Sequence, residues 1–492
     1  MDIAFVSSEV VPFAKTGGLA DVAEALPREL EKLGHRPVVF VPAYRQARQC
    51  GVPIEATDVE VSVLVGSKRV PGRLLRSHLP NSRVPVYLVQ QDSYFDRPQL
   101  YRENGSDYKD NCERFAFFCR AVMQAIRALG LSLDVLHCND WQTGLLPAYL
   151  KIEHGHVPSH ARMASLLTLH NMAYQGQFWH WDMLLTGLDW KYFNWHQMEF
   201  HGHLNLLKTG IVFADAINTV SPRYAQEIQH APAGWGLEAV LRHRSDVLSG
   251  IINGVNYDIW DPRHDPLIEA PYDETTWMTG KAQCKAALQR ELGLPVDPRC
   301  PLIGLVGRLA DQKGWDLVGE LMQYWSRDRD VQWAILGTGD ESHEELLQRL
   351  AQEHPGRVAA RLGFSDSLAH RIEAGADMFV MASWYEPCGL NQLYSLRYGA
   401  VPIVHRTGGL ADTITDATPE TLAGSTANGF SFDHYSVAHL EEALTRACHM
   451  YTHEWSRWRQ LVETGMKQDW SWTRSAKQYL DLYARIVAPK QA

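Results

Sequence analysis

Short apolar runs alternate with amphipathic stretches along most of the chain. Residues 3–6 are apolar and precede a stretch, 19–33, in which leucine, valine and alanine recur at helical spacing. Further apolar runs lie at 37–41, 135–137, 165–170, 216–220, 302–306, 333–336, 378–381 and 402–404. Because strands separated by helices build βαβ units, the pattern predicts an α/β protein with parallel sheets covered by helices on both faces.

A break in this pattern divides the chain. Residues 251–262, IINGVNYDIWDP, are dense in turn-forming residues and predict an interdomain hinge. The chain has 492 residues, more than the roughly 250–300 at which a single core stops growing, so we expect two domains. The expected parts are a domain at 1–250, the hinge, a domain at 263–465 and a C-terminal helix within 466–492. The expected fold is two doubly wound domains facing each other across a cleft, with ligands beyond the carboxyl ends of the strands.

Composition and charge narrow the class of protein. A net charge of -10 and a pI near 6.1 disfavour a grip on nucleic acid. Eight cysteines without CxxC pairs or zinc spacing suit a reducing compartment. No apolar run reaches the roughly 18 residues that span a bilayer, and the N-terminus resembles a strand and loop rather than a signal peptide. We therefore expect a cytoplasmic protein, or a mature plastid protein, without nucleic-acid or membrane partners.

The first motif that can carry chemistry is KTGGLAD at 15–21, between the first strand and the first helix. Paired glycines let a ligand approach the backbone, and a helix N-terminus offers N–H groups to a phosphate. Lys15 adds a positive charge, although a tight turn with a solvated lysine would produce the same pattern. The string is neither GxGxxG nor a Walker loop, so a dinucleotide dehydrogenase or a P-loop kinase is poorly supported.

The string TGGLAD occurs again at 407–412, after the strand at 402–404. Two such turns, one in each predicted domain and each beyond a strand, can hold a diphosphate and a sugar. The repetition favours a binding role for both turns over two unrelated turns.

Charged side chains follow other strands. Arg308 and Lys313, after 302–306, would neutralise a departing diphosphate, or else are surface cations. Glu386, in EPCGLNQL after 378–381, suits a hydroxyl-rich substrate and a cationic transition state, although a helix dipole also favours glutamate there. His170, in TLHNMAYQG, ends a strand and can reach a sugar or serve structurally.

Two other patterns resemble metal sites and are predicted not to be. Asp328 and Asp330 form a DxD that precedes a strand, at the wrong edge of the sheet. His154, His156 and His160 lie in a loop without cysteine or carboxylate companions at zinc spacing. We expect no metal.

Taken in order, a series of long strings resembles the glycogen/starch synthase family over nearly the whole chain. The strings are KTGGLADV, HCNDWQTGLLPAYL, TLHNMAYQG, NTVSPRYA, INGVNYDIWDP, GRLADQKGWD, EPCGLNQLYSLRYG and RTGGLADT. The resemblance implies the GT-B fold, two Rossmann-like domains that close on each other, with the last helix crossing back to the first domain. It implies transfer of glucose from ADP-glucose to the non-reducing end of an α-1,4-glucan, glycogen or starch, with retention of configuration and without a cofactor.

The resemblance also implies roles for individual residues. Lys15, Gly18, Arg308 and Lys313 would hold the diphosphate, and Glu386 would lie beside the transferred glucose. The remaining candidate contacts are His170 and Asn171 to glucose, Asp140 to sugar or acceptor, Phe364 to adenine, and Asp21, Cys388, Gly389, Leu390, Thr407, Gly408 and Gly409 to sugar and phosphates.

The chain departs from the wider GT-B pattern at one informative position. A second glutamate eight positions after the first is replaced by Tyr394, which leaves one carboxylate in the motif. A double displacement needs a nucleophile beside the anomeric carbon, so front-face departure and attack are favoured. Two other functions stay open from the residues: a transferase that makes a small glucoside, and a glucan-binding scaffold without catalysis.

Overall fold

The computed structural model describes residues 1–491. The chain divides into two compact units. Unit 1 comprises residues 1–220 and 225–251 together with the helix that starts at Trp472, and unit 2 comprises residues 221–224 and 252–471. Within residues 1–491, no helix combines enough length with enough apolar character to cross a membrane.

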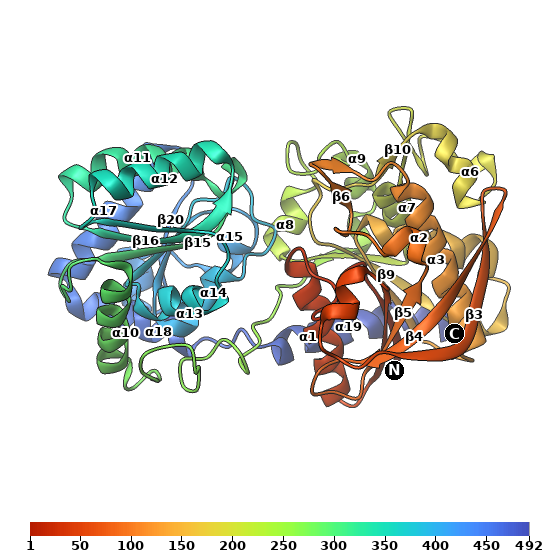
Figure 1. The fold of residues 1–492 in the computed structure, drawn as a ribbon, viewed down its shortest axis with the longest axis horizontal. Coiled ribbons are helices and arrows are strands. Elements are labelled where there is room, and N and C mark those ends of the chain that lie inside the picture. The colour runs from red at the N-terminus through yellow and green to blue at the C-terminus, as the bar shows by residue number, and fades with distance from the viewer. Residues whose placement is uncertain (492) are drawn as a thin grey trace. The chain divides into compact units, whose positions relative to one another are not determined.

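Unit 1 is built on one large sheet (Figure 1). Its strands are β1 (Asp2–Val6), β2 (Arg36–Pro42), β3 (Glu55–Val65), β4 (Lys68–His78), β5 (Pro85–Gln90), β8 (Val135–Asn139), β9 (Ala164–Leu169), β13 (Ala216–Thr219) and β14 (Leu248–Gly250). Their order is β14-β13-β9-β8-β1-β2-β5-β4-β3, in which β4 pairs antiparallel with its two neighbours and the other pairs are parallel. Residues 3–6 of β1 are fully buried, as expected for a strand covered on both faces.

The helices of residues 1–251 and of the C-terminus belong to unit 1, except that α8 begins in residues 221–224 of unit 2. They are α1 (Gly18–Lys32), α2 (Asp92–Phe95), α3 (Asn111–Ala128), α4 (Leu145–Tyr149), α5 (Pro158–Ala161), α6 (Met183–Thr186), α7 (Leu206–Phe213), α8 (Pro222–Glu227), α9 (Glu238–His243) and α19 (Trp472–Gln491). Short strands outside the large sheet are β6 (Arg102–Glu103), β7 (Ser106–Asp107), β10 (Gln177–Phe178), β11 (Glu199–Phe200) and β12 (His203–Asn205).

Unit 2 is a parallel sheet between two layers of helices (Figure 1). Its strands, in the sheet order β17-β16-β15-β18-β19-β20, are β17 (Val358–Leu362), β16 (Gln332–Gly339), β15 (Leu302–Leu309), β18 (Met378–Met381), β19 (Val401–His405) and β20 (Phe430–Phe432). Its helices are α10 (Trp277–Leu292), α11 (Trp315–Asp328), α12 (Glu341–Glu353), α13 (Asp366–Gly375), α14 (Asn391–Tyr398), α15 (Gly408–Thr413), α16 (Pro419–Ala423), α17 (Val437–His453) and α18 (Trp455–Lys467).

The predicted α/β class with parallel sheets is confirmed, and two strand boundaries need correction. The strand predicted at 302–306 continues to Leu309, so Arg308 lies within β15 instead of after it. The strand predicted at 165–170 ends at Leu169, so His170 is the first residue beyond it. Most of the segment 251–262 packs within unit 2, where Trp260 stacks on Tyr394 with ring centroids 4.0 Å apart.

The C-terminal helix α19 is part of the core of unit 1. Its buried face carries Trp472, Ala476, Tyr479 and Tyr483, which pack with apolar residues of α1 and of the central strands. The hydroxyl groups of the two tyrosines reach buried polar groups: Asn218 Nδ2 donates to Tyr479 Oη at 3.0 Å, and Tyr483 Oη lies 2.7 Å from His137 Nδ1. Unit 1 therefore needs residues from both ends of the chain.

This packing predicts a large stability loss in Tyr479→Ala. The variant would leave a cavity and remove the partner of Asn218, which should destabilise unit 1 by about 3–5 kcal/mol. Urea unfolding followed by circular dichroism measures the loss. Gln478→Ala, on the exposed side of the same helix, is the matched control and should change stability by less than about 0.5 kcal/mol; equal stability of the two variants would contradict the role given to α19.

Candidate functional site

The strand order of unit 2 creates a crevice at one point. From β15 the chain builds β16 and β17 on one side, and β18, β19 and β20 on the other. The loops that leave the carboxyl ends of β15 and β18 therefore diverge, and such switch points are where open α/β sheets bind ligands. Lys313 follows β15 and Glu386 follows β18, so both stand at the edge of the sheet that the switch point defines.

An ion pair joins the two loops. Lys313 Nζ lies 2.5 Å from Glu386 Oε2, and Ser383 Oγ donates to the same oxygen at 3.0 Å. The Glu386 side chain is largely buried, while Lys313 is partly exposed. Both donors use Oε2, and Oε1 has no partner within residues 1–491, which leaves one carboxylate oxygen for a hydroxyl or a cation. A carboxylate held by two donors is fixed in direction, as a site for an oriented sugar requires.

Arg308 is the exposed member of this group. Its Nη2 donates to Gln312 Oε1 at 3.2 Å, and Gln312 Nε2 donates in turn to the carbonyl of Tyr385 at 2.8 Å. The guanidinium thus stands beside the loop that carries Glu386, with most of its donors in solvent. It is placed to bind an anion.

Two glycine-containing loops pack backbone against backbone beside Glu386. Gly409 N donates to the carbonyl of Glu386 at 3.1 Å. A Cβ at Gly408, where φ is +43°, would lie 2.0 Å from the Glu386 carbonyl oxygen, and one at Gly409 would lie 2.0 Å from that of Cys388. Only glycine permits this approach, which brings the predicted residues Cys388, Gly389, Leu390, Thr407, Gly408 and Gly409 together at the ends of β18 and β19.

Phe364 and Cys388, two further candidates in unit 2, differ in how exposed they are. Phe364 follows β17, two strands away from β15, and its side chain is 91% exposed. Cys388 is buried, and burial raises the pKa of its thiol to about 12. The thiol is therefore protonated near neutral pH and cannot act as a nucleophile.

Unit 1 has its own switch point, between β1 and β8. The loop beside it is held by Glu9, a residue that the sequence motifs did not single out. Glu9 is buried, and its carboxylate accepts hydrogen bonds from Thr16 N at 2.5 Å, Thr16 Oγ1 at 2.6 Å and Gly17 N at 3.1 Å. The Tyr101 hydroxyl donates to it as well, at 2.8 Å. Glu9 thus holds the glycine loop in shape. The signal available in the sequence was a glutamate three residues after the first strand.

Glu9 changes what the KTGG loop can offer a phosphate. The N–H groups of Thr16 and Gly17 already bind Glu9, so the donors left for a ligand start at Gly18, the first residue of α1. A Cβ at Gly17 or Gly18 would meet no atom within 4 Å, so the packing of unit 1 does not require glycine there. Lys15 Nζ pairs with Asp21 Oδ1 at 2.7 Å on the surface.

Asp140 and His170 meet at the ends of β8 and β9. Asp140 Oδ1 accepts from the backbone N–H of His170 at 2.7 Å, and the Asp140 carboxyl also accepts from the backbone N–H of Asn171. Asp140 has φ +55°, which is strained for a residue other than glycine, and such strain gathers at functional sites. Burial raises the pKa of its carboxyl to about 7, and the nearby Glu9 carboxylate adds to the shift.

The orientation of the His170 ring follows from its neighbour. Asn139 Nδ2 donates to the Val6 carbonyl at 3.0 Å, which directs Asn139 Oδ1 toward His170 Nε2 at 2.9 Å. Nε2 therefore carries the proton and Nδ1 is left as an acceptor. Burial lowers the pKa of His170 to about 3, so the ring is neutral near pH 7.

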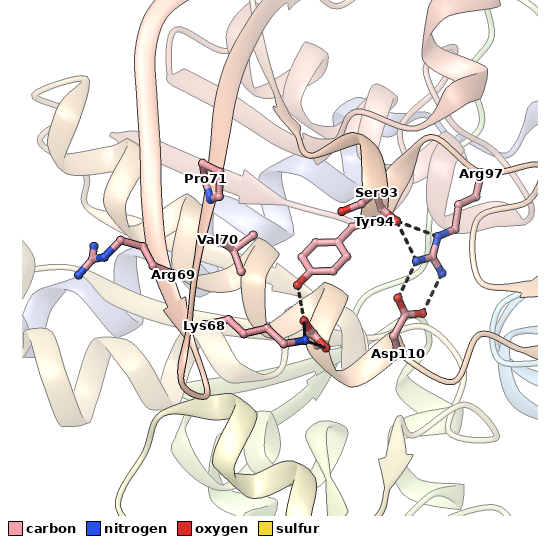
Figure 2. A pocket seen from close by; sticks show the side chains of 9 residues that line it. Lys68, Arg69, Val70, Pro71, Ser93, Tyr94, Arg97 and Asp110 are labelled. Carbon is pink, nitrogen blue, oxygen red and sulfur yellow. Dashed lines mark hydrogen bonds and ion pairs between the residues drawn. The ribbon is translucent and has the colours of Figure 1, made fainter.

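The remaining candidates lie elsewhere. Asp328 ends α11, pairs with Arg327 and stands at the amino edge of β16. Within residues 1–491, no three His, Cys, Asp or Glu side chains are grouped so as to hold a metal ion. A separate hollow of about 580 Å³ lies between the β3–β4 hairpin and α3 (Figure 2), and none of the predicted site residues lines it. Four of its charged residues form ion pairs, Lys68 with Glu113 and Arg97 with Asp110.

The raised pKa of Asp140 predicts a pH-dependent stability that Asp140→Asn removes. A carboxyl whose pKa rises from 3.8 to about 7 on folding stabilises the folded state fully below pH 4, and this contribution is lost as the pH rises through 7. Because the residue is partly exposed, we expect an effect on the order of 1–2 kcal/mol. The melting temperature of Asp140→Asn relative to wild type should therefore rise between pH 4 and 7.5, while that of Asp107→Asn, an exposed control, should not; parallel curves would contradict the shift.

Both units match families of known proteins. Residues 2–243 match the family model described as starch synthase catalytic domain, and residues 291–463 match glycosyl transferases group 1. The glycogen synthase of Rhodopirellula baltica is 48% identical over 99% of this chain and 98% of its own, and that of Anaeromyxobacter dehalogenans (strain 2CP-C) is 47% identical over 99% and 100%.

Solved structures agree with this placement. The catalytic domain of starch synthase IV from Arabidopsis thaliana, described as bound to ADP and acarbose, superposes with a TM-score of 0.88 at 30% identity and covers 99% of each chain. Sucrose-phosphate synthase from Thermosynechococcus elongatus has a TM-score of 0.58 at 16% identity, which shows a shared fold alone. The predicted GT-B fold is thereby confirmed, and the chain belongs to the glycogen/starch synthase family.

Proposed function

We propose that this chain transfers glucose from ADP-glucose to the non-reducing end of an α-1,4-glucan with retention of anomeric configuration. The observation that carries the proposal is the Lys313–Glu386 pair at the switch point of unit 2, in a chain whose relatives at 47–48% identity are glycogen synthases. The related starch synthase IV structure, which is described with ADP and acarbose, supports a nucleotide and a glucan-like oligosaccharide as ligands.

In this proposal unit 2 binds the donor. Arg308 and Lys313 neutralise the diphosphate, and the free Oε1 of Glu386 accepts from a glucose hydroxyl. The loop residues Cys388–Leu390 and Thr407–Gly409 contact sugar and phosphate through their backbones, and Phe364 packs against adenine. The exposure of Phe364 supports that role, because an aromatic face that packs on nothing else is open to a base.

Unit 1 supplies the acceptor side and further donor contacts. Gly18 N and Lys15 bind the diphosphate, with Asp21 orienting Lys15. His170 and Asn171 contact the glucose, and Asp140 positions their backbone through the hydrogen bonds it accepts. A neutral His170 suits this position, because a second cation would oppose the positive charge that develops on the sugar.

The chemistry we propose is a front-face substitution. The bond between the anomeric carbon and the diphosphate oxygen breaks, and the electron pair leaves with ADP. The acceptor 4-hydroxyl attacks the same face and passes its proton to the departing phosphate, so that configuration is retained. Lys313 and Arg308 stabilise the charge on the leaving diphosphate, and Glu386 stabilises the cationic sugar.

The role of Glu386 predicts a large rate loss in Glu386→Gln. Glutamine can still accept from Lys313 and Ser383, so the fold should persist while the negative charge is lost. We expect glucan elongation from ADP-glucose to fall about 10²–10³-fold. Initial rates on glycogen with ADP-glucose and with UDP-glucose measure this, with Glu341→Gln on the surface of α12 as the matched control.

The same assay tests the reaction itself. Labelled polymer formed from ADP-glucose supports the proposal. A soluble glucoside would replace it with a small-acceptor transferase, and binding of glycogen without turnover would replace it with a scaffold.

Because the space at Gly18 is open, we expect a substitution there to weaken donor binding without lowering the stability of the protein. Gly18→Ala adds a methyl group that meets no protein atom, so melting temperature should stay unchanged or rise slightly. The methyl group would occupy the approach path of the diphosphate, so KM for ADP-glucose should rise at least tenfold. Gly356→Ala, whose Cβ would make only ordinary contacts in unit 2, is the control; an unchanged KM would remove Gly18 from the site.

A further inference from the structure

Residues 179–193 of unit 1 present several large aromatic side chains to solvent. Trp179 is 60% exposed, Trp181 is 49% exposed and Trp190 is 41% exposed. Isolated exposed apolar residues are common, whereas a contiguous group of them marks a binding surface. Trp195, Trp235, Trp384 and Trp455 are exposed as well, so what distinguishes the segment is that its exposed indoles lie next to one another.

The three exposed indoles and the half-buried ring of Phe193 lie next to one another. The ring centroids of Trp181 and Trp190 are 5.5 Å apart, and those of Trp190 and Phe193 are 5.2 Å apart, with interplanar angles of 33° and 29°. Trp179 extends the series, with its centroid 6.4 Å from that of Trp181. These four residues, Trp179, Trp181, Trp190 and Phe193, are called the aromatic face below.

The chemistry of the aromatic face fits a sugar chain better than an apolar partner. Within residues 1–491 nothing accepts a hydrogen bond from the indole N–H of its three tryptophans, so these donors are available. Asp189 and Lys191 are exposed beside Trp190 and add a charged acceptor and donor. Sugar rings have an apolar C–H face for stacking and hydroxyl groups for such polar neighbours.

The aromatic face is anchored to the layer that holds Asp140 and His170. Its segment begins at β10, where Phe178 packs on Trp141 with ring centroids 5.7 Å apart. Trp141 directly follows Asp140 and is itself buried. A Cβ at Gly176 would lie 2.4 Å from the Trp141 ring, so the chain between His170 and the aromatic face is closely packed on that indole.

We propose that the aromatic face binds α-1,4-glucan at residues remote from the growing end, as a polymer-holding surface of unit 1. This inference rests on the proposed function for the identity of the glucan. A polymer would be retained between transfers by stacking on the indoles, while an acceptor too short to reach the face would not benefit. The surface therefore acts on affinity for long glucans and not on the chemical step.

The test compares Trp179→Ala/Trp181→Ala with Trp455→Ala, a control that removes an equally exposed tryptophan from α18 of unit 2. Electrophoresis through gels containing glycogen, without donor, measures binding directly. The double variant should show a Kd for glycogen at least tenfold above that of wild type and of the control. KM for glycogen should rise by a similar factor, while kcat, KM for ADP-glucose and KM for maltotriose stay within twofold.

The outcomes separate this inference from the proposed function. Equal glycogen binding by the double variant and the control would overturn the aromatic face as a glucan surface, whatever the transfer rate. Weakened glycogen binding by the double variant, in a wild-type protein that transfers no glucose, would support the aromatic face and reject the proposed reaction. A wild-type dimer that dissociates in the double variant, with glycogen binding unchanged, would assign the aromatic face to self-association and overturn the proposal. Trp190→Ala, a single exposed substitution, repeats the measurement should the double variant fold poorly.

Discussion

The site depends on one geometric constraint: parallel strands joined by helices place all their outgoing loops at one edge of the sheet. In unit 2 this brings together loops from β15, β18 and β19, although the residues they carry are separated by about a hundred positions. The Lys313–Glu386 pair is the chemical result, since the buried Glu386 carboxylate needs a positively charged partner. The close backbone packing at Gly408 and Gly409 then fixes the loop from which Glu386 projects.

Each unit places a buried carboxylate beside its switch point, and the two carboxylates differ in what holds them. Glu9 accepts backbone and hydroxyl hydrogen bonds from the KTGG loop and the hydroxyl of Tyr101, which satisfies both of its oxygens. Glu386 has two donors on one oxygen and none on the other. Glu9 is therefore a residue that shapes a loop, while Glu386 retains capacity for a ligand. The Glu9 carboxylate also favours the protonated form of the nearby Asp140. This explains why two carboxyl groups are tolerated at this end of β1 and β8.

The sequence was most informative where a pattern has a single physical reading. Strands covered on both faces appear as apolar runs, so β18 was predicted at its observed limits and β1 within one residue. Strands with one exposed face were harder, because β3 and β4 alternate polar and apolar residues and were not predicted. The end of β15 was missed for a related reason: its apolar run stops at Val306, while pairing with β16 continues through Leu309.

Side-chain environments were the least predictable part of the site. The two TGGLAD strings are identical, yet Gly18 borders open space whereas Gly409 is pressed against the Cys388 carbonyl. The difference arises from which loop packs on each turn, and that is a tertiary property absent from the local string. Glu9 escaped attention for the same reason, since its importance lies in the three groups of the KTGG loop that bind it.

Tyr394 shows how packing constrains the mechanism we propose. Its ring lies parallel to that of Trp260, with an interplanar angle of 2°. The ring of His370 also stacks on Trp260, with ring centroids 3.7 Å apart. A carboxylate at position 394 would have to share this stack, where desolvation opposes its charge. The aromatic stack therefore excludes a second ionised carboxylate from this turn of α14, and Glu386 is left as the carboxylate of its motif. With Cys388 protonated, the motif holds no nucleophilic group besides Glu386, whose free Oε1 the proposal assigns to a glucose hydroxyl, and front-face substitution is preferred on that basis.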